Sequence, residues 1–112
     1  MEIKELSQAM DDLVRAKGWY ETDTLRAQTP RNIAISLSLE AAEILEHFQW
    51  SEKSPEPGEL PGELADVMLY LLQLARVTGI DLEEAVLKKI EINYGRTWDE
   101  QVRNTEISGE IV

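Results

Sequence analysis

The sequence predicts an all-α protein, a four-helix bundle-like domain that homo-oligomerisation completes. Apolar residues recur at helical spacing in long segments, and no segment shows the alternation typical of a strand. Glycine and proline separate these segments, as they do at helix ends. At 112 residues the chain is one domain near the size at which self-association often completes hydrophobic burial. We therefore expect a homo-oligomer, either a dimer or a tetramer.

The first helix is expected over residues 3–16, where the apolar side chains have amphipathic spacing and Lys17-Gly18 closes the helix. Residues 19–28 are expected to form a loop. The second helix is expected over residues 30–50, because Thr29 suits an N-cap and Pro30 suits the first helical position.

The third helix is expected over residues 61–78, after a proline-rich loop, and it is apolar nearly all round. Such a helix belongs at the centre of a bundle. Gly79 separates it from a fourth helix over residues 82–95, for which Asp81 and Glu84 form a capping pair. Residues 97–112 form a C-terminal tail, either a short helix or the arm of a dimer.

Composition narrows the possible ligands and partners. The net charge of −11 argues against binding to a nucleic-acid polymer or an anionic membrane, since both need clustered basic residues. It remains compatible with an anionic substrate that a metal delivers. Because there is no cysteine, any metal must have oxygen ligands, which favours Mg²⁺, or Mn²⁺, over structural zinc.

The amino terminus lacks the basic-then-apolar order of a signal peptide, and no apolar run approaches the roughly 18 residues of a membrane span. We expect a soluble, cytoplasmic protein that does not enter a membrane.

Two pairs of acidic residues lie within the apolar second and third helices. At about 100° per residue, Glu40 and Glu43 share a strip with Ser36 and His47, and apolar residues border this strip on both sides. We expect the strip to be sunk between neighbouring elements.

In the third helix, Glu63, Asp66, Tyr70 and Gln73 follow a single line among aliphatic residues. If the two helices pack antiparallel, the four carboxylates can surround one pocket. An unpaired buried carboxylate is costly, and a divalent cation removes that cost, so this arrangement predicts a magnesium site. The alternative is that single acids are exposed or favour a helix terminus.

The fourth helix carries polar groups on its apolar face. Lys89 and Asn93 project with aliphatic residues, and Arg96 lies close to the same line. They are suited to phosphate oxygens or a ribose, although Lys89 could also extend outward and Arg96 lie on the surface. Trp50 could stack on a base beside the acidic strip, or pack in the core.

The remaining aromatic and imidazole groups have simpler interpretations. Trp19 and Trp98 are expected to pack against apolar neighbours. His47 is the only histidine, and we expect it at the rim of the pocket rather than as a ligand.

Several motifs together resemble one known family. These are Pro30-Arg31-Asn32, Glu40-Ala-Ala-Glu43, Phe48-Gln49-Trp50, Glu63-Leu-Ala-Asp66 and Lys89-Ile-Glu-Ile-Asn93. The chain resembles the MazG-like all-α nucleoside triphosphate pyrophosphohydrolases, with greatest similarity to the dCTP pyrophosphatase branch. The similarity covers residues 29–96. It departs from many family members at Leu39, where they carry a further glutamate, and it is weak over residues 19–28.

The resemblance implies a helical homo-oligomer that hydrolyses a nucleoside triphosphate to the monophosphate and pyrophosphate with magnesium. It also implies a housekeeping role in the nucleotide pool. By position, the metal ligands and catalytic groups would be Glu40, Glu43, Glu63 and Asp66. The substrate contacts would be Trp50, Tyr70, Lys89 and Asn93.

Under this hypothesis a water attacks the α-phosphorus in line with the departing pyrophosphate, and Lys89 and Arg96 offset the charge on the leaving group. One carboxylate could act as the general base, with Glu43 named as a candidate. Two alternatives stay open, a non-catalytic acidic interaction or nucleotide-sensing protein and a phosphohydrolase that releases inorganic phosphate.

Overall fold

A computed structural model describes residues 1–96 of the chain. Within them it contains four helices and no strand, which confirms the all-α class. The helices are α1 (Ile3–Ala16), α2 (Pro30–His47), α3 (Leu60–Val77) and α4 (Leu82–Tyr94). The chain divides into two compact units, residues 1–82 and 83–112, and each is described by itself.

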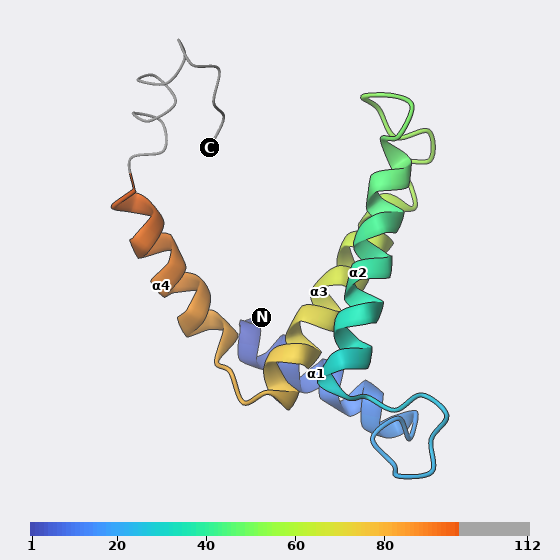
Figure 1. The fold of residues 1–112 in the computed structure, drawn as a ribbon, viewed down its shortest axis with the longest axis vertical. Helices are drawn as coiled ribbons and strands as arrows, with labels where there is room; N and C mark the ends of the chain where they lie inside the picture. Colours follow the sequence, from blue (N-terminus) through green and yellow to red (C-terminus); the bar gives the residue numbers. More distant parts are fainter. Residues whose placement is uncertain (97–112) are drawn as a thin grey trace. The chain divides into compact units, whose positions relative to one another are not determined.

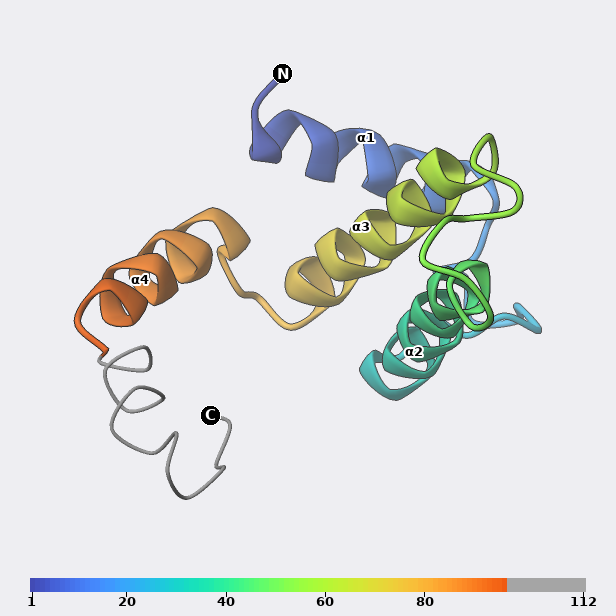
Figure 2. The same ribbon diagram turned by 90° about the horizontal axis from the view of Figure 1, so that it is seen from above.

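The first unit is built on α3, which contacts both α1 and α2 and lies between them (Figures 1 and 2). Its central place follows from the apolar surface that nearly surrounds it. The core where α1 meets α3 consists of Met10, Val14 and Leu72, and partly buried residues including Trp19 and Met68 pack against it. The central position predicted for the third helix is therefore confirmed within this unit.

Glycines end α1 and α3 in the same way. Gly18 and Gly79 adopt φ angles of 69° and 72°, a left-handed conformation that favours glycine. After α3, the N–H of Gly79 donates to the Arg76 carbonyl and that of Ile80 donates to the Ala75 carbonyl, at 3.2 and 2.8 Å. This is the Schellman arrangement, which satisfies carbonyls that the helix leaves open.

The same motif directs the chain out of α1. The N–H groups of Gly18 and Trp19 donate to the carbonyls of Arg15 and Val14, at 3.0 and 3.1 Å. Because a side chain that follows such a turn commonly packs back on the last helical turns, Trp19 reaches the core beside Val14. Core packing of Trp19 is confirmed, whereas Trp98 lies outside the described residues.

The second helix begins as predicted. The Thr29 hydroxyl accepts a hydrogen bond from the Asn32 N–H at 3.1 Å, and Pro30 occupies the first turn. The helix is shorter than the expected 30–50, since it ends at His47 and Phe48 has non-helical angles of −116° and 9°. It runs antiparallel to α3 and lies beside it (Figure 1), which is the arrangement expected for the two acidic helices.

Packing of α2 differs from the expectation that its acidic strip is deeply sunk. In the first unit α2 packs on α3, and its opposite side stays open. Ile35, Leu39 and Leu45 are exposed, Leu39 by 63%. The strip is therefore half-buried at Glu40 but exposed at Glu43.

The second unit contains most of α4. Its larger apolar side chains are exposed in the structure, namely Val86, Leu87, Ile90 and Ile92. The expected tail over residues 97–112 lies outside the described residues. None of the helices in residues 1–96 is long and apolar enough to cross a lipid bilayer.

One buried acid joins α1 to α3. Asp11 is 3% exposed, and its two carboxylate oxygens pair with Arg15 Nε at 2.7 Å and Arg76 Nε at 3.1 Å. Arg76 also donates to Gln8 Oε1 at 3.2 Å. Both oxygens of the buried carboxylate are thus compensated, as burial of a charge requires.

We expect Asp11→Ala to lower the free energy of unfolding by about 2 kcal/mol, the scale of a lost hydrogen bond to a charged group. Urea denaturation measures this change. Asp12→Ala, which removes the neighbouring exposed acid, is the control and should stay within about 0.5 kcal/mol of the wild type. Equal stability of the two variants would contradict the role of Asp11.

Candidate active site

The site lies along the contact between α2 and α3. Glu40 and Glu43 are one turn apart on α2, and Glu63 and Asp66 are one turn apart on α3. Glu40 and Glu63 are half-buried, whereas Glu43 and Asp66 are exposed. We call these four residues the carboxylate cluster.

Mutual repulsion shows that the cluster is assembled in space. The pKa of Glu40 is raised, first by burial, then by the negative charges of Glu43 and Asp66, by a side-chain hydrogen bond with Glu43 and by the charge of Glu63. The three other acids, one on α2 and two on α3, therefore all lie near enough to act on Glu40. In addition, Glu40 Oε2 is buried and has no hydrogen-bond partner among the described residues.

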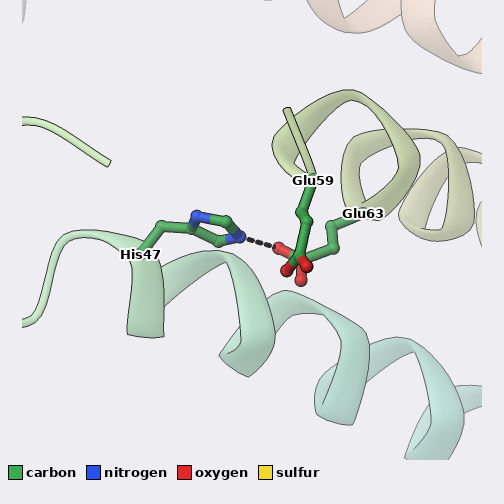
Figure 3. A group of neighbouring side chains, drawn as sticks. All are labelled: His47, Glu59 and Glu63. Atoms are coloured by element: carbon green, nitrogen blue, oxygen red, sulfur yellow. Dashed lines mark ion pairs between the residues drawn. The ribbon is translucent and has the colours of Figure 1, made fainter. Parts of the chain in front are cut away.

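His47 lies at the end of α2 beside the first turn of α3. Its Nε2 pairs with Glu63 Oε2 (Figure 3), and its Nδ1 shares a hydrogen bond with the Ser54 hydroxyl. The residue is 8% exposed, so the expectation of a rim position is wrong. Burial follows from the loop after α2, which folds Ser54 back onto the ring.

Glu59 joins this end of the site, and its side chain reaches the same place as that of Glu63 (Figure 3). One ligand atom each from His47, Glu59 and Glu63 lies within 4.8 Å of the others, a spacing that could hold a metal ion. The pKa of Glu59 is raised, chiefly by a side-chain hydrogen bond with Glu56. The site thus offers two overlapping sets of metal ligands that share Glu63.

The donor set of the carboxylate cluster fits a hard cation. Mg²⁺ and Mn²⁺ prefer carboxylate oxygens, and Glu40 Oε2 is a buried acceptor without a partner. A divalent cation would also remove the repulsion that raises the Glu40 pKa. The set that contains His47 adds a nitrogen ligand, which suits a transition metal better than Mg²⁺.

A hollow of about 300 Å³ adjoins the cluster at its other end. Ser36 and Tyr70, each one turn from a cluster residue, form part of its lining together with the loop before α2. The remaining lining residues are Trp19, Leu25, Arg26, Ala27, Gln28, Asn32 and Ile35. Arg26 lies over the Trp19 ring, 5.9 Å from its centroid.

The structure does not bring all the predicted substrate contacts together. Tyr70 lines the hollow, but Trp50 lies beyond the end of α2 and is 90% exposed. Lys89 and Asn93 are one turn apart on α4, and Arg96 follows that helix. These three belong to the second unit, so their part in the site stays a prediction.

Sequence reasoning missed the loop residues of the hollow and Glu59. Residues 19–28 have no helical periodicity, so the sequence contained no signal for which of them face α2 and α3. Glu59 precedes α3 by one residue, and its spacing of four from Glu63 and seven from Asp66 places it on the same helix face, so this signal was available in the sequence. A second signal was His47, which shares the acidic strip of α2 and could have been paired with an acid on the facing helix.

Comparison with known proteins identifies the family. The sequence profile of the MazG-like family matches residues 35–110. This chain belongs to the MazG-like family. Human and mouse dCTP pyrophosphatase 1 are 38% and 36% identical to it over 86 and 85 residues, which cover 68% of this chain and 50% of each relative. This MazG-like chain therefore spans about half the length of these relatives.

Two further similarities are shorter or structural. The dATP/dGTP diphosphohydrolase of cyanophage S-2L is 45% identical over 38 residues, 34% of this chain and 36% of that protein. The crystal structure of a pyrophosphatase from Archaeoglobus fulgidus matches this MazG-like fold with a TM-score of 0.67 and 40% identity. The match covers 80% of this chain and 86% of that one.

Burial of Glu40 and repulsion from its acidic neighbours raise its pKa and so predict a pH dependence of stability in the metal-free protein. A carboxyl group whose pKa is raised on folding contributes stability below its unfolded pKa, near 4.5, and loses it as the pH rises through the raised value. With EDTA present, we expect wild-type unfolding free energy to fall more steeply over this interval than that of Glu40→Gln. Parallel profiles from urea denaturation would contradict the assignment.

Proposed function

We propose that this protein hydrolyses nucleoside triphosphates to the monophosphate and pyrophosphate with Mg²⁺, for which Mn²⁺ can substitute. The activity would serve nucleotide-pool housekeeping in the cytoplasm. The observation that carries this proposal is the carboxylate cluster, in which two helices direct four acids toward one another. Clustered, partly desolvated carboxylates repel one another, and His47, which pairs with Glu63, cannot compensate all four, so a bound cation would stabilise the cluster.

The cation would be held by Glu40, Glu43, Glu63 and Asp66, and when bound it supplies charge neutralisation for the triphosphate. Glu40 contributes its buried oxygen without a hydrogen-bond partner. Glu43 is exposed, so the attacking water can reach its carboxylate. We therefore assign Glu43 as the candidate general base.

The hollow beside the cluster would receive the nucleoside. Its lining combines aromatic faces, Trp19 and Tyr70, with amide groups, Gln28 and Asn32. Aromatic faces stack on any base, whereas amides can hydrogen-bond selected base edges. A nucleotide placed with its base there has its phosphates directed along α2 and α3 toward the carboxylate cluster.

Four further residues are proposed as substrate contacts. Lys89 and Arg96 would bind phosphate oxygens, and Asn93 a phosphate or the sugar. Trp50 would close the nucleotide pocket by stacking.

The substrate class is proposed from the relatives. Those named dCTP pyrophosphatase 1 and dATP/dGTP diphosphohydrolase act on deoxynucleotides according to their names. Deoxynucleoside triphosphates, with dCTP and modified nucleotides first, are therefore the proposed substrates.

Hydrolysis of a panel of canonical and modified triphosphates tests the function. With Mg²⁺ we expect monophosphate plus pyrophosphate, and no products after chelation. Glu43→Gln and Asp66→Asn should each reduce kcat at least about a hundredfold, the contribution of a general base or a metal ligand.

Glu59→Gln is the matched control, because it also converts an acid to an amide near the site. We expect its kcat to stay within about threefold of the wild type. If Glu59→Gln abolished hydrolysis while Asp66→Asn did not, the cation would belong with His47, Glu59 and Glu63. Release of inorganic phosphate would indicate a different phosphohydrolase, and no turnover would favour a non-catalytic nucleotide-binding protein.

We also propose that a second copy of the chain covers the open side of α2. Ile35 and Leu39 are exposed one turn apart, and they line a shallow, largely apolar hollow together with Arg31, Ala34 and Ser38. Exposed apolar surface of this kind marks a protein–protein contact, and we propose that a copy of the same chain supplies the partner surface. The resulting assembly is a dimer or a tetramer.

Leu39→Glu should shift the protein to the monomer, because two charged groups would be desolvated in each interface. Size-exclusion chromatography with light scattering measures the mass. Leu25→Glu, at a fully exposed loop leucine, is the control and should leave the mass unchanged. A wild-type protein that is monomeric at all concentrations would refute the proposal.

A further inference from the structure

One buried amide ties the loop of the nucleoside hollow to α3. Gln73 is 3% exposed, and its Nε2 donates to Gln28 Oε1 at 2.6 Å. Gln28 lines the hollow, whereas Gln73 does not. Any effect of Gln73 on a molecule in the hollow therefore passes through Gln28.

A backbone carbonyl determines the direction of this hydrogen bond. Gln28 Nε2 donates to the Arg26 carbonyl at 2.6 Å. Because a carbonyl only accepts, the nitrogen of Gln28 must face Arg26 and its oxygen must face Gln73. Gln73 must then present its own nitrogen, so both amides have a single orientation.

The segment that carries Gln28 has little other support. Residues 25–28 take part in none of the backbone–backbone hydrogen bonds outside helices in the described part of the chain. The segment depends instead on side-chain contacts. Asn32 Nδ2 donates to the Ala27 carbonyl at 3.0 Å, and the Arg26 N–H donates to the Thr24 hydroxyl at 3.1 Å.

These contacts, and that of Arg26 with the Trp19 ring, join residues no more than seven positions apart in the sequence. Among the hydrogen bonds of residues 1–96, the bond between Gln73 and Gln28 is the one that joins this segment to α3. Gln73 stands three residues beyond Tyr70 on α3 and is buried. Loss of the bond would release Gln28 and the adjoining carbonyls to sample several positions, since a free glutamine has many rotamers.

We infer that Gln73 is a positioning residue that sets the base preference of the site by holding Gln28 in one orientation. The inference rests on the proposed function and deepens it. A fixed amide offers a defined pattern of donor and acceptor, and it rejects bases whose edges do not match, because polar groups would be left unpaired. A mobile glutamine adapts to several bases and so discriminates less.

The test compares kcat and KM of Gln73→Met with the wild type for dCTP, dTTP, dATP and dGTP. Methionine keeps the length of the side chain and removes the donor. We expect the KM of the preferred substrate to rise about tenfold, the effect of one buried hydrogen bond. The kcat value and the KM values of the other substrates should change less than about threefold. The enzyme would then discriminate less strongly between the preferred base and the others.

Two further variants separate positioning from a general loss of structure. Gln28→Met should weaken the discrimination between bases in the same way. The KM of the preferred substrate should be no higher for the double variant than for either single variant, because all three remove the same bond. Gln8→Met replaces an exposed glutamine on α1 and is the control, with unchanged base ranking. If Gln73→Met fails to fold, Gln73→Asn, which keeps the amide but is too short to reach Gln28, tests the same bond from α3.

The results distinguish the two levels of the proposal. A wild-type protein that hydrolyses no triphosphate overturns the proposed function, and this inference with it. Hydrolysis by Gln73→Met or Gln28→Met with the wild-type base ranking, or with an equal loss for all bases, overturns the positioning role alone.

Discussion

The antiparallel contact of α2 with α3 is the constraint on which the site depends. It places four carboxylates from two helices beside one another, and burial and like charge together raise the pKa of Glu40. Such an arrangement opposes folding of the metal-free chain. The apolar surface of α3, packed against α1 and α2, is what offsets this repulsion, and a bound cation would convert it into attraction.

A single helix pair therefore organises three chemically different regions in one line. At one end, His47 on α2 pairs with Glu63 on α3. The carboxylate cluster occupies the middle, and the hollow lined by Ser36 and Tyr70 lies at the other end. The order follows from antiparallel packing, because residues late in α2 must face residues early in α3.

Polar groups on α3 have different tasks according to their position. Glu63 and Asp66 belong to the carboxylate cluster and Tyr70 lines the hollow, while Gln73 and Arg76 bind the loop and α1. The helix is thus the common support of the core, the acidic site and the loop. A substitution within it can disturb the site without touching a ligand.

The sequence by itself determined the helices and placed one acidic pair on a face of each of α2 and α3. Helical periodicity, Thr29-Pro30 and the glycines after α1 and α3 act locally, and a spacing of three residues puts each acidic pair on one face. Only the tertiary structure decided the partners of His47, Gln28 and Gln73, because these contacts join segments remote along the chain. Residues 19–28 show no helical or strand periodicity from which the orientation of their side chains could be predicted. Their positions depend on the surface of α3 against which they pack, and that surface exists only once the helices have assembled.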